Sequence, residues 1–109
     1  MFEYIKADGK ITDILVNGKQ VKRGSMRGFK KAQACSYFRI IDSPTVFTNP
    51  WSGVEVELNP LESTIYNFCD QWYKHYRAEK DTQATVRDYD DMKYFLLELN
   101  SQAYMDLID

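Results

Sequence analysis

Apolar residues recur at helical spacing over residues 60–78. Asn59 is the expected N-cap, Pro60 takes the first helical position, and Glu62 follows the cap by three residues, as in a capping box. Steps of three and four residues place one apolar stripe on the helix: Leu61, Ile65, Phe68, Cys69, Trp72 and Tyr76. We therefore predict an amphipathic helix over residues 60–78 that buries this stripe.

A second helical pattern follows the polar linker 79–83 and runs to the C-terminus. We predict a helix over residues 87–108 that begins near Thr85 or Arg87. Its first turn is rich in acid, which the positive end of the helix dipole favours. Asn100-Ser101 is an expected break, with Ser101 capping a short last helix. The apolar positions are Met92, Phe95, Leu96, Leu99, Ala103 and Leu107.

Before residue 59 the pattern changes to alternation and to β-branched or aromatic runs, which predicts strands. Asn17-Gly18 suits a type I′ turn and predicts a tight hairpin, and Asp8-Gly9 predicts a turn before it. Residues 49–53 form a loop in which Pro50 and Gly53 take turn positions. The predicted strands are 2–6, 11–16, a partner ending at 23–24, 34–41, 45–47 and 54–58.

Residues 25–33 leave two interpretations open. Ser25 would cap a short helix carrying Met26, Phe29 and Ala32, although an internal Gly28 costs about 1 kcal/mol relative to Ala. A basic loop is the alternative.

Strands in the first half and helices in the second indicate an α+β fold. We predict one domain, 1–109, with 1–58 mainly β and 59–109 mainly α. The N-terminal hairpins would form a small antiparallel sheet with the two C-terminal helices packed on one face. The expected core is Ile14, Val16, Phe38, Ile40, Val54 or Val56, Leu61, Ile65, Phe68, Trp72, Phe95, Leu96 and Leu99.

Composition fits such a domain, because 44% of the 109 residues are hydrophobic and can build a core without metal or disulfides. No apolar run has the length of a membrane span, and the N-terminus lacks the features of a signal peptide. A cytoplasmic location without membrane contact is therefore expected. In that compartment Cys35 and Cys69 are expected to be small buried thiols.

Charge is distributed unevenly along the chain. Residues 1–41 carry nine lysines and arginines against three acids, a net +6, whereas residues 42–109 carry five against thirteen, a net −8. The basic stretch is a candidate nucleic-acid contact through phosphates, with Phe29, Tyr37 and Phe38 stacking on bases if they are exposed. A solvated face balanced by the acidic helices is the alternative. The candidate contacts are Lys19, Lys22, Arg23, Arg27, Lys30 and Lys31.

Catalytic and metal-binding motifs are absent from the sequence. The acids Asp81, Asp88, Asp90 and Asp91 lack the glycine and distal glutamate of an EF-hand loop. The single histidine, His75, lies six residues from Cys69 and does not share a helix face with it. We expect no enzyme activity, no cofactor and no metal.

Aromatic residues exceed what one helical stripe can bury, so some lie near the surface. Tyr and Trp are enriched where one protein meets another, and rim packing is the alternative explanation. The candidate protein-contact aromatics are Trp51, Tyr66, Tyr73, Tyr76 and Tyr104.

The segment NPWSGVEVELNPLESTIYNF and the ending SQAYMDLID resemble a group of small uncharacterised tailed-bacteriophage proteins. That group shares an NPxxGxxVEL segment and a C-terminal AYxxL(L/I)D helix. The resemblance covers about the C-terminal half of the chain and leaves out the basic hairpin. It implies a small accessory protein of the infected host's cytoplasm, with no assigned activity and no catalytic residues.

Two functional hypotheses follow. The first is a non-enzymatic protein that modulates or inhibits a host or phage protein, or that associates with itself, for instance as a homodimer through the helices. The alternative is a nucleic-acid-binding module that uses the basic hairpin 17–31. Chain order alone leaves open whether the acidic helices neutralise that hairpin.

Overall fold

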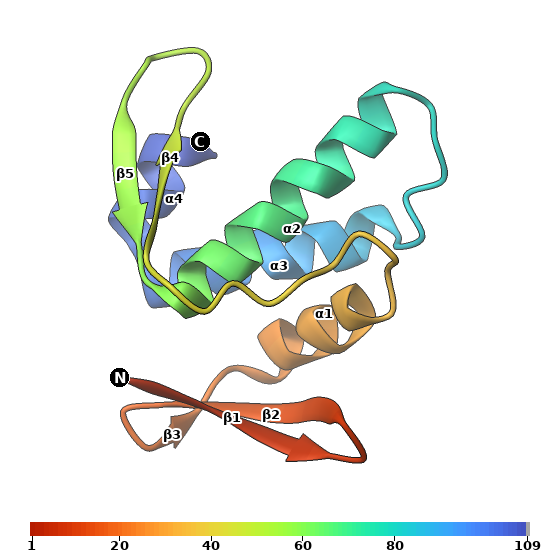
Figure 1. The fold of residues 1–109 in the computed structure, drawn as a ribbon, viewed down its shortest axis with the longest axis vertical. Helices are drawn as coiled ribbons and strands as arrows, with labels where there is room; N and C mark the ends of the chain where they lie inside the picture. Colours follow the sequence, from red (N-terminus) through yellow and green to blue (C-terminus); the bar gives the residue numbers. More distant parts are fainter. Residues whose placement is uncertain (109) are drawn as a thin grey trace.

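The computed structural model describes residues 1–108 and confirms the α+β class. Strands β1 (Phe2–Ala7), β2 (Lys10–Val16) and β3 (Lys19–Gln20) form one antiparallel sheet in the order β1-β2-β3. Strands β4 (Thr45–Thr48) and β5 (Glu55–Leu58) pair separately as a hairpin. Thus the strands divide between two sheets, one at either end of the molecule (Figure 1).

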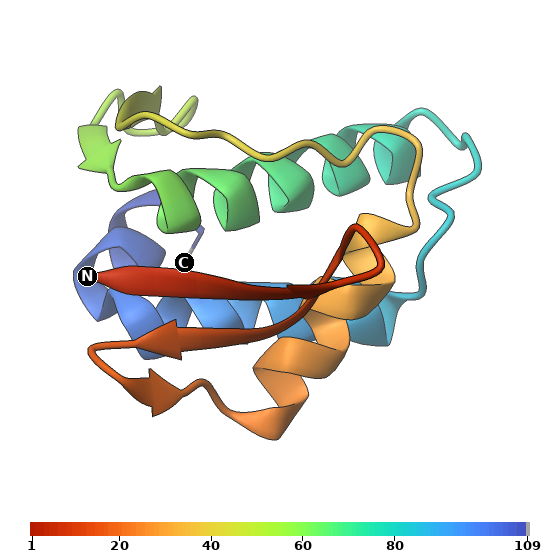
Figure 2. The same ribbon diagram turned by 60° about the horizontal axis from the view of Figure 1, so that its bottom comes forward.

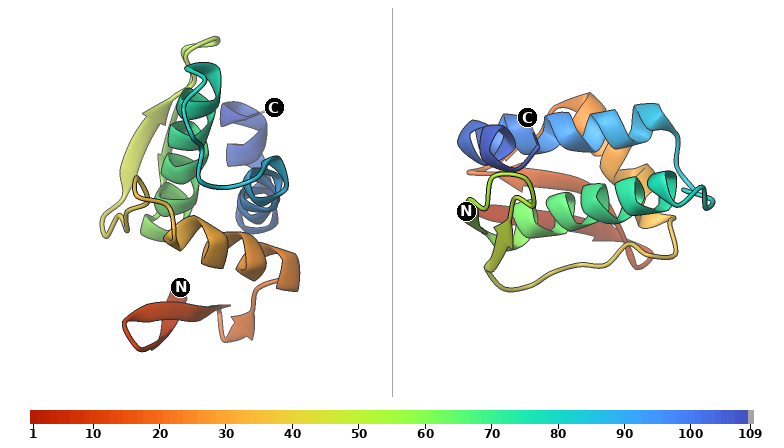
Figure 3. Two further views of the ribbon diagram at one scale, coloured as in Figure 1. Left: turned by 90° about the vertical axis from the view of Figure 1, so that its right-hand side faces the viewer. Right: turned by 90° about the horizontal axis from the view of Figure 1, so that it is seen from above.

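Within residues 1–108, four helices lie between the sheets or beside them. They are α1 (Arg23–Gln33), α2 (Pro60–Arg77), α3 (Val86–Leu99) and α4 (Ser101–Leu107). Helices α2 and α3 run antiparallel and side by side (Figure 3). Helix α1 lies between the three-stranded sheet and the α2–α3 pair (Figures 1 and 3). The C-terminal helix α4 packs against the β4–β5 hairpin.

Most of the predicted turns and caps are present. Asn17 and Gly18 have φ values of 52° and 81°, and Val16 pairs with Lys19 across them, as a type I′ hairpin requires. The Asn59 side chain accepts a hydrogen bond from the Glu62 amide, and the Glu62 carboxylate accepts one from the Asn59 amide. Thr85 caps α3 in the same way with Asp88. The last helix begins one residue earlier than expected, because Asn100 and not Ser101 accepts from the Ala103 amide.

Residues 25–33 are helical, as part of α1, which begins at Arg23. The strand predicted to end at 23–24 therefore ends at Gln20, and Ser25 lies inside the helix and does not cap it. Gly28 sits where α1 meets α3, and a Cβ there would lie 2.6 Å from the Cβ of Asp91. Since non-bonded carbons ordinarily stay about 3.5–4.0 Å apart, only glycine allows this approach. The helical interpretation is therefore confirmed, and the glycine that weakens α1 locally permits its packing.

The strand predicted over residues 34–41 is wrong. The chain forms a turn after α1 and then runs extended along α2 without strand pairing (Figure 2). Thr64 of α2 holds it, since its hydroxyl accepts from the Ile41 amide at 2.9 Å. Aromatic side chains in this segment pack on helices, with Phe38 against Phe29 and Phe68. The β-branched and aromatic residues of this segment therefore serve packing on the helices and not strand pairing.

The core lies between α1, α2, α3 and the inner face of β2. Ile14, Phe29, Phe68 and Phe95 are almost wholly inaccessible. Most of the predicted core is confirmed: Ile14, Leu61, Ile65, Phe68, Trp72, Phe95 and Leu96 are buried, and Val16, Phe38, Val56 and Leu99 pack against the cluster half-buried. Ile40 is 44% exposed and does not belong to it, because the unpaired segment carrying it turns that side chain outward.

Candidate functional site

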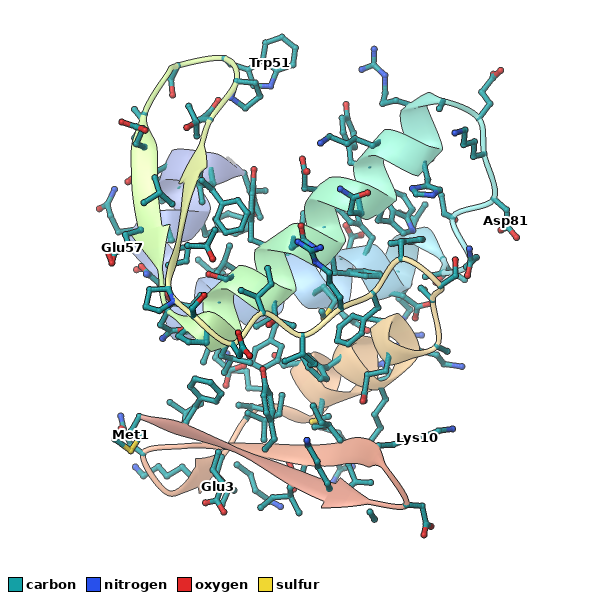
Figure 4. The ribbon with its side chains drawn as sticks, viewed as in Figure 1. Met1, Glu3, Lys10, Trp51, Glu57 and Asp81 are labelled. Atoms are coloured by element: carbon teal, nitrogen blue, oxygen red, sulfur yellow. The ribbon has the colours of Figure 1, made fainter. Side chains whose placement is uncertain are left out.

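Aromatic side chains converge on a groove between the tip of the β4–β5 hairpin and the helices. We call this the aromatic groove; its cavity volume is about 380 Å³. Trp51 is 88% exposed at the hairpin tip, on the side that faces α2 (Figure 4). The groove is lined by Pro50 and Trp51 of the tip, Tyr66, Cys69, Asp70, Tyr73 and Lys74 of α2, Tyr89 of α3, and Leu107 and Ile108 at the end of α4.

Asn49 fixes the hairpin tip that carries Trp51. Its buried side chain accepts hydrogen bonds from the amides of Trp51 (2.8 Å) and Ser52 (3.2 Å). It also donates to the carbonyl oxygen of Asp106 in α4 at 2.8 Å. Gly53, with φ 78°, closes the loop and donates its amide to the Asn49 carbonyl. The loop is thus tied to α4, which holds Trp51 out in solvent.

Stacked rings support the helical wall of the groove. The ring of Trp72 lies between those of Tyr89 (4.2 Å between centroids) and Tyr76 (5.2 Å). The indole N–H of Trp72 donates to the Ala84 carbonyl at 3.0 Å, which satisfies its polar atom. Arg77 lies over the ring of Tyr73 and donates to its hydroxyl. These contacts restrict Tyr73 and Tyr76, although both are exposed.

The structure brings three of the five candidate aromatics together. Trp51, Tyr66 and Tyr73 line the aromatic groove, with Tyr66 mostly buried against Phe47. Tyr76 adjoins it through its stack with Tyr73 (6.5 Å), whereas Tyr104 lies outside the lining. Three further lining residues, Tyr89, Leu107 and Ile108, are absent from the candidate set predicted from the sequence. For the two at the end of α4 the reason is that the position of this helix depends on the distant contact between Asn49 and Asp106.

Cations gather on a second groove, between α1 and strands β2 and β3. We call this the basic groove; its cavity volume is about 630 Å³. Four of the six candidate cations line it: Arg23, Arg27, Lys30 and Lys31. Lys19 lies outside the lining, and Lys22 lines a neighbouring depression beside Asp91 and Glu98. The remaining lining is Thr12, Asp13, Gln20, Val21 and Met26.

The acidic helix α3 neutralises this face only in part. Arg27 forms an ion pair with Asp91 at 3.1 Å. Glu98 accepts from the Lys22 amide (3.1 Å) and the Ser25 hydroxyl (2.7 Å) at the start of α1, where the helix dipole favours an anion. Within residues 1–108, the other five candidate cations have no carboxylate at ion-pair distance.

The three aromatic residues proposed to stack on bases are not exposed, as such stacking would require. Phe29 is fully buried. Tyr37 stacks on His75 (4.4 Å) and Phe68 (5.7 Å), and its hydroxyl donates to the Thr82 carbonyl. With Phe38 packed on Phe29, these three rings belong to the interior and its rim.

The two thiols lie in the interior of the described structure. Cys35 and Cys69 are free and buried, as predicted. Burial raises the pKa of both thiols above the ordinary cysteine value, which favours the protonated, weakly nucleophilic form. The Nδ1 of His75 lies 2.8 Å from the Gln71 carbonyl oxygen.

Two further properties concern metal and membrane. Among residues 1–108, no three His, Cys, Asp or Glu side chains are placed to hold a metal ion. No helix in that range is both long and apolar enough to cross a membrane.

Comparisons with protein-family models, with curated proteins and with solved structures find no match to this chain. The resemblance to tailed-bacteriophage proteins therefore stays a prediction.

Proposed function

We propose that this chain is a small non-enzymatic binding protein whose aromatic groove receives a protein partner. The partner is a host or phage protein that the chain modulates or inhibits, or a second copy of the chain. The observation that carries the proposal is Trp51, held 88% exposed at the rim of a groove lined by tyrosines.

The energetics favour an interface at this position. Trp and Tyr are enriched among residues that cost about 2 kcal/mol or more when truncated in an interface. Each immobilised side chain or loop costs affinity, and a contact surface that is already fixed avoids much of this cost. Asn49 fixes the tip and the Trp72 stack fixes the tyrosines before any partner arrives.

Two substitutions and a matched control test the proposal. Trp51→Ala and Tyr73→Ala remove exposed rings of the aromatic groove, whereas Tyr94→Ala removes a similarly exposed ring from another face. Light scattering measures self-association, and affinity capture from a bacterial host lysate measures other partners. The wild type and Tyr94→Ala should form the same dimer or retain the same protein, which Trp51→Ala and Tyr73→Ala should lose.

Two results would contradict the proposal. One is a strict monomer that retains no protein from the lysate. The other is a complex that survives Trp51→Ala and Tyr73→Ala unchanged, which would place the interface elsewhere.

A further inference from the structure

We infer that the basic groove binds a run of phosphates in a nucleic-acid backbone, without reading the bases. This goes beyond the proposed protein contact and uses another face of the molecule. The ligand class follows from three observations: the spacing of the cations, the form of the groove, and the interior positions of the nearby aromatic rings.

The cations form one row along α1. Arg23, Arg27 and Lys31 follow one another at four-residue steps, with Lys30 beside them, so they share one helix face. At about 1.5 Å of rise per residue, successive members of the row lie about 6 Å apart along the helix axis. Such a row can meet successive phosphates of one strand, as in channels that follow a single nucleic-acid backbone.

The second wall of the groove is held at a fixed distance from this row. Gln33 at the end of α1 accepts from the Ile11 amide (3.0 Å) and donates to the Ile11 carbonyl (2.8 Å), which ties α1 to β2. Val21 and Met26 form the apolar floor, and Gln20 and Thr12 supply polar groups opposite the cations. The groove therefore exists before any ligand binds.

One carboxylate in the groove opposes a phosphate. Asp13 lines the same wall, where its oxygens accept from the Ile14 amide (2.8 Å) and from the Gln20 side chain. Arg27 is paired with Asp91, so among the described lining residues three unpaired cations face Asp13, and the groove stays positive. Replacing the acid by its amide should therefore strengthen the binding of an anion.

Base recognition is not expected at this groove. Phe29, Tyr37 and Phe38 pack in the interior and its rim, and none of the described lining residues of the groove is aromatic. Contacts to phosphates position a protein but carry no sequence information. The affinity should therefore depend on salt and hardly at all on base composition.

Fluorescence anisotropy with labelled probes tests the inference: a single-stranded oligo(dT), a single-stranded oligo(dA), and a mixed-sequence duplex. With four phosphate contacts, log affinity should fall against log salt with a slope of about −3 for a single strand and about −3.6 for the duplex. Lys30→Ala/Lys31→Ala should roughly halve the slope. Lys80→Ala/Arg87→Ala makes the same change in net charge on exposed residues away from the groove and should leave the slope unchanged.

Asp13→Asn gives an independent readout, which does not require the loss of any cation. It should tighten binding by about two- to fivefold at low salt, because one repulsive charge is removed. No binding at 50 mM salt and tens of micromolar protein would overturn the inference. So would equal slopes for the wild type and Lys30→Ala/Lys31→Ala, weaker binding by Asp13→Asn, or more than tenfold discrimination between oligo(dT) and oligo(dA).

Discussion

The two grooves differ in how their contact residues are held. In the aromatic groove, hydrogen bonds from Asn49 fix the exposed Trp51, and stacking on Trp72 fixes the neighbouring tyrosines. In the basic groove, only Arg27 of the four lining cations has an ion-pair partner within residues 1–108. A fixed apolar surface suits one defined partner, whereas long, separately mobile cations suit a repetitive polyanion.

Both grooves depend on the same core, so a core substitution should remove both together. Phe68 of α2 is 1% exposed and contacts Tyr37 and Phe38 of the segment that follows α1. Phe68→Ala should lower the free energy of unfolding by about 3–5 kcal/mol, measured by denaturant titration. Ile40→Ala, at an exposed site in that segment, should change it by less than about 0.5 kcal/mol. An unchanged melting temperature for Phe68→Ala would show that this face of α2 is not buried.

Gly28→Ala should act on the side of the basic groove, because it disturbs the contact between α1 and α3 and leaves the hairpin tip unchanged. The added Cβ would lie 2.6 Å from the Asp91 Cβ and 3.3 Å from the Met92 amide nitrogen. We expect a loss of about 1–3 kcal/mol of stability from this overpacking, although alanine favours a helix by about 1 kcal/mol. Thermal unfolding measures it. A stabilised Gly28→Ala protein would mean that α1 and α3 are not so close.

Asn49→Ala should disturb the other groove. The substitution removes the acceptor for the Trp51 and Ser52 amides and the donor to the Asp106 carbonyl. We expect a loss of about 1–2 kcal/mol and a more mobile tip, seen as faster hydrogen exchange at residues 50–54. Exchange in α1 should stay unchanged, and equal acceleration in both regions would contradict the separation of the two sites.

Alkaline pH should lower the free energy of unfolding through Cys69, which lies beside the aromatic groove. Burial raises the pKa of the Cys69 thiol above its ordinary value of 9.0, so the folded chain keeps a proton that the unfolded chain releases. This contribution to stability is complete below pH 9 and falls by about 1.4 kcal/mol per pH unit above it, until the folded pKa is reached. Denaturant titrations at pH 8 and pH 10 should show the loss, and Cys69→Ala should reduce it.

Local signals in the sequence predicted much of the fold. The capping residues Asn59 and Glu62, the Asn17-Gly18 turn and the apolar stripe of α2 each act within a few residues, and the structure contains all of them. The failures came from distant contacts. The extended segment before residue 42 pairs with the Thr64 hydroxyl in place of a strand, a contact that its own composition does not indicate.

The candidate sites were predictable as residue types and not as surfaces. The charge pattern identified the basic residues. Which of them line the groove depends on how α1 packs against β2, which the hydrogen bonds between Gln33 and Ile11 fix. The surplus of aromatics was visible, yet the position of Trp51 depends on Asn49 reaching Asp106, 57 residues away. Such pairings are tertiary, and no local pattern encodes them.

Photocrosslinking from the hairpin tip tests the central proposal, protein binding at the aromatic groove, most directly. A photoreactive phenylalanine analogue replaces the exposed Ser52, next to Trp51, in one protein and the exposed Tyr94 in a matched control. Irradiation in a bacterial lysate, or of the concentrated pure protein, should give one discrete covalent adduct from position 52 and none from position 94. No adduct from position 52, or the same adducts from both positions, would contradict the proposal.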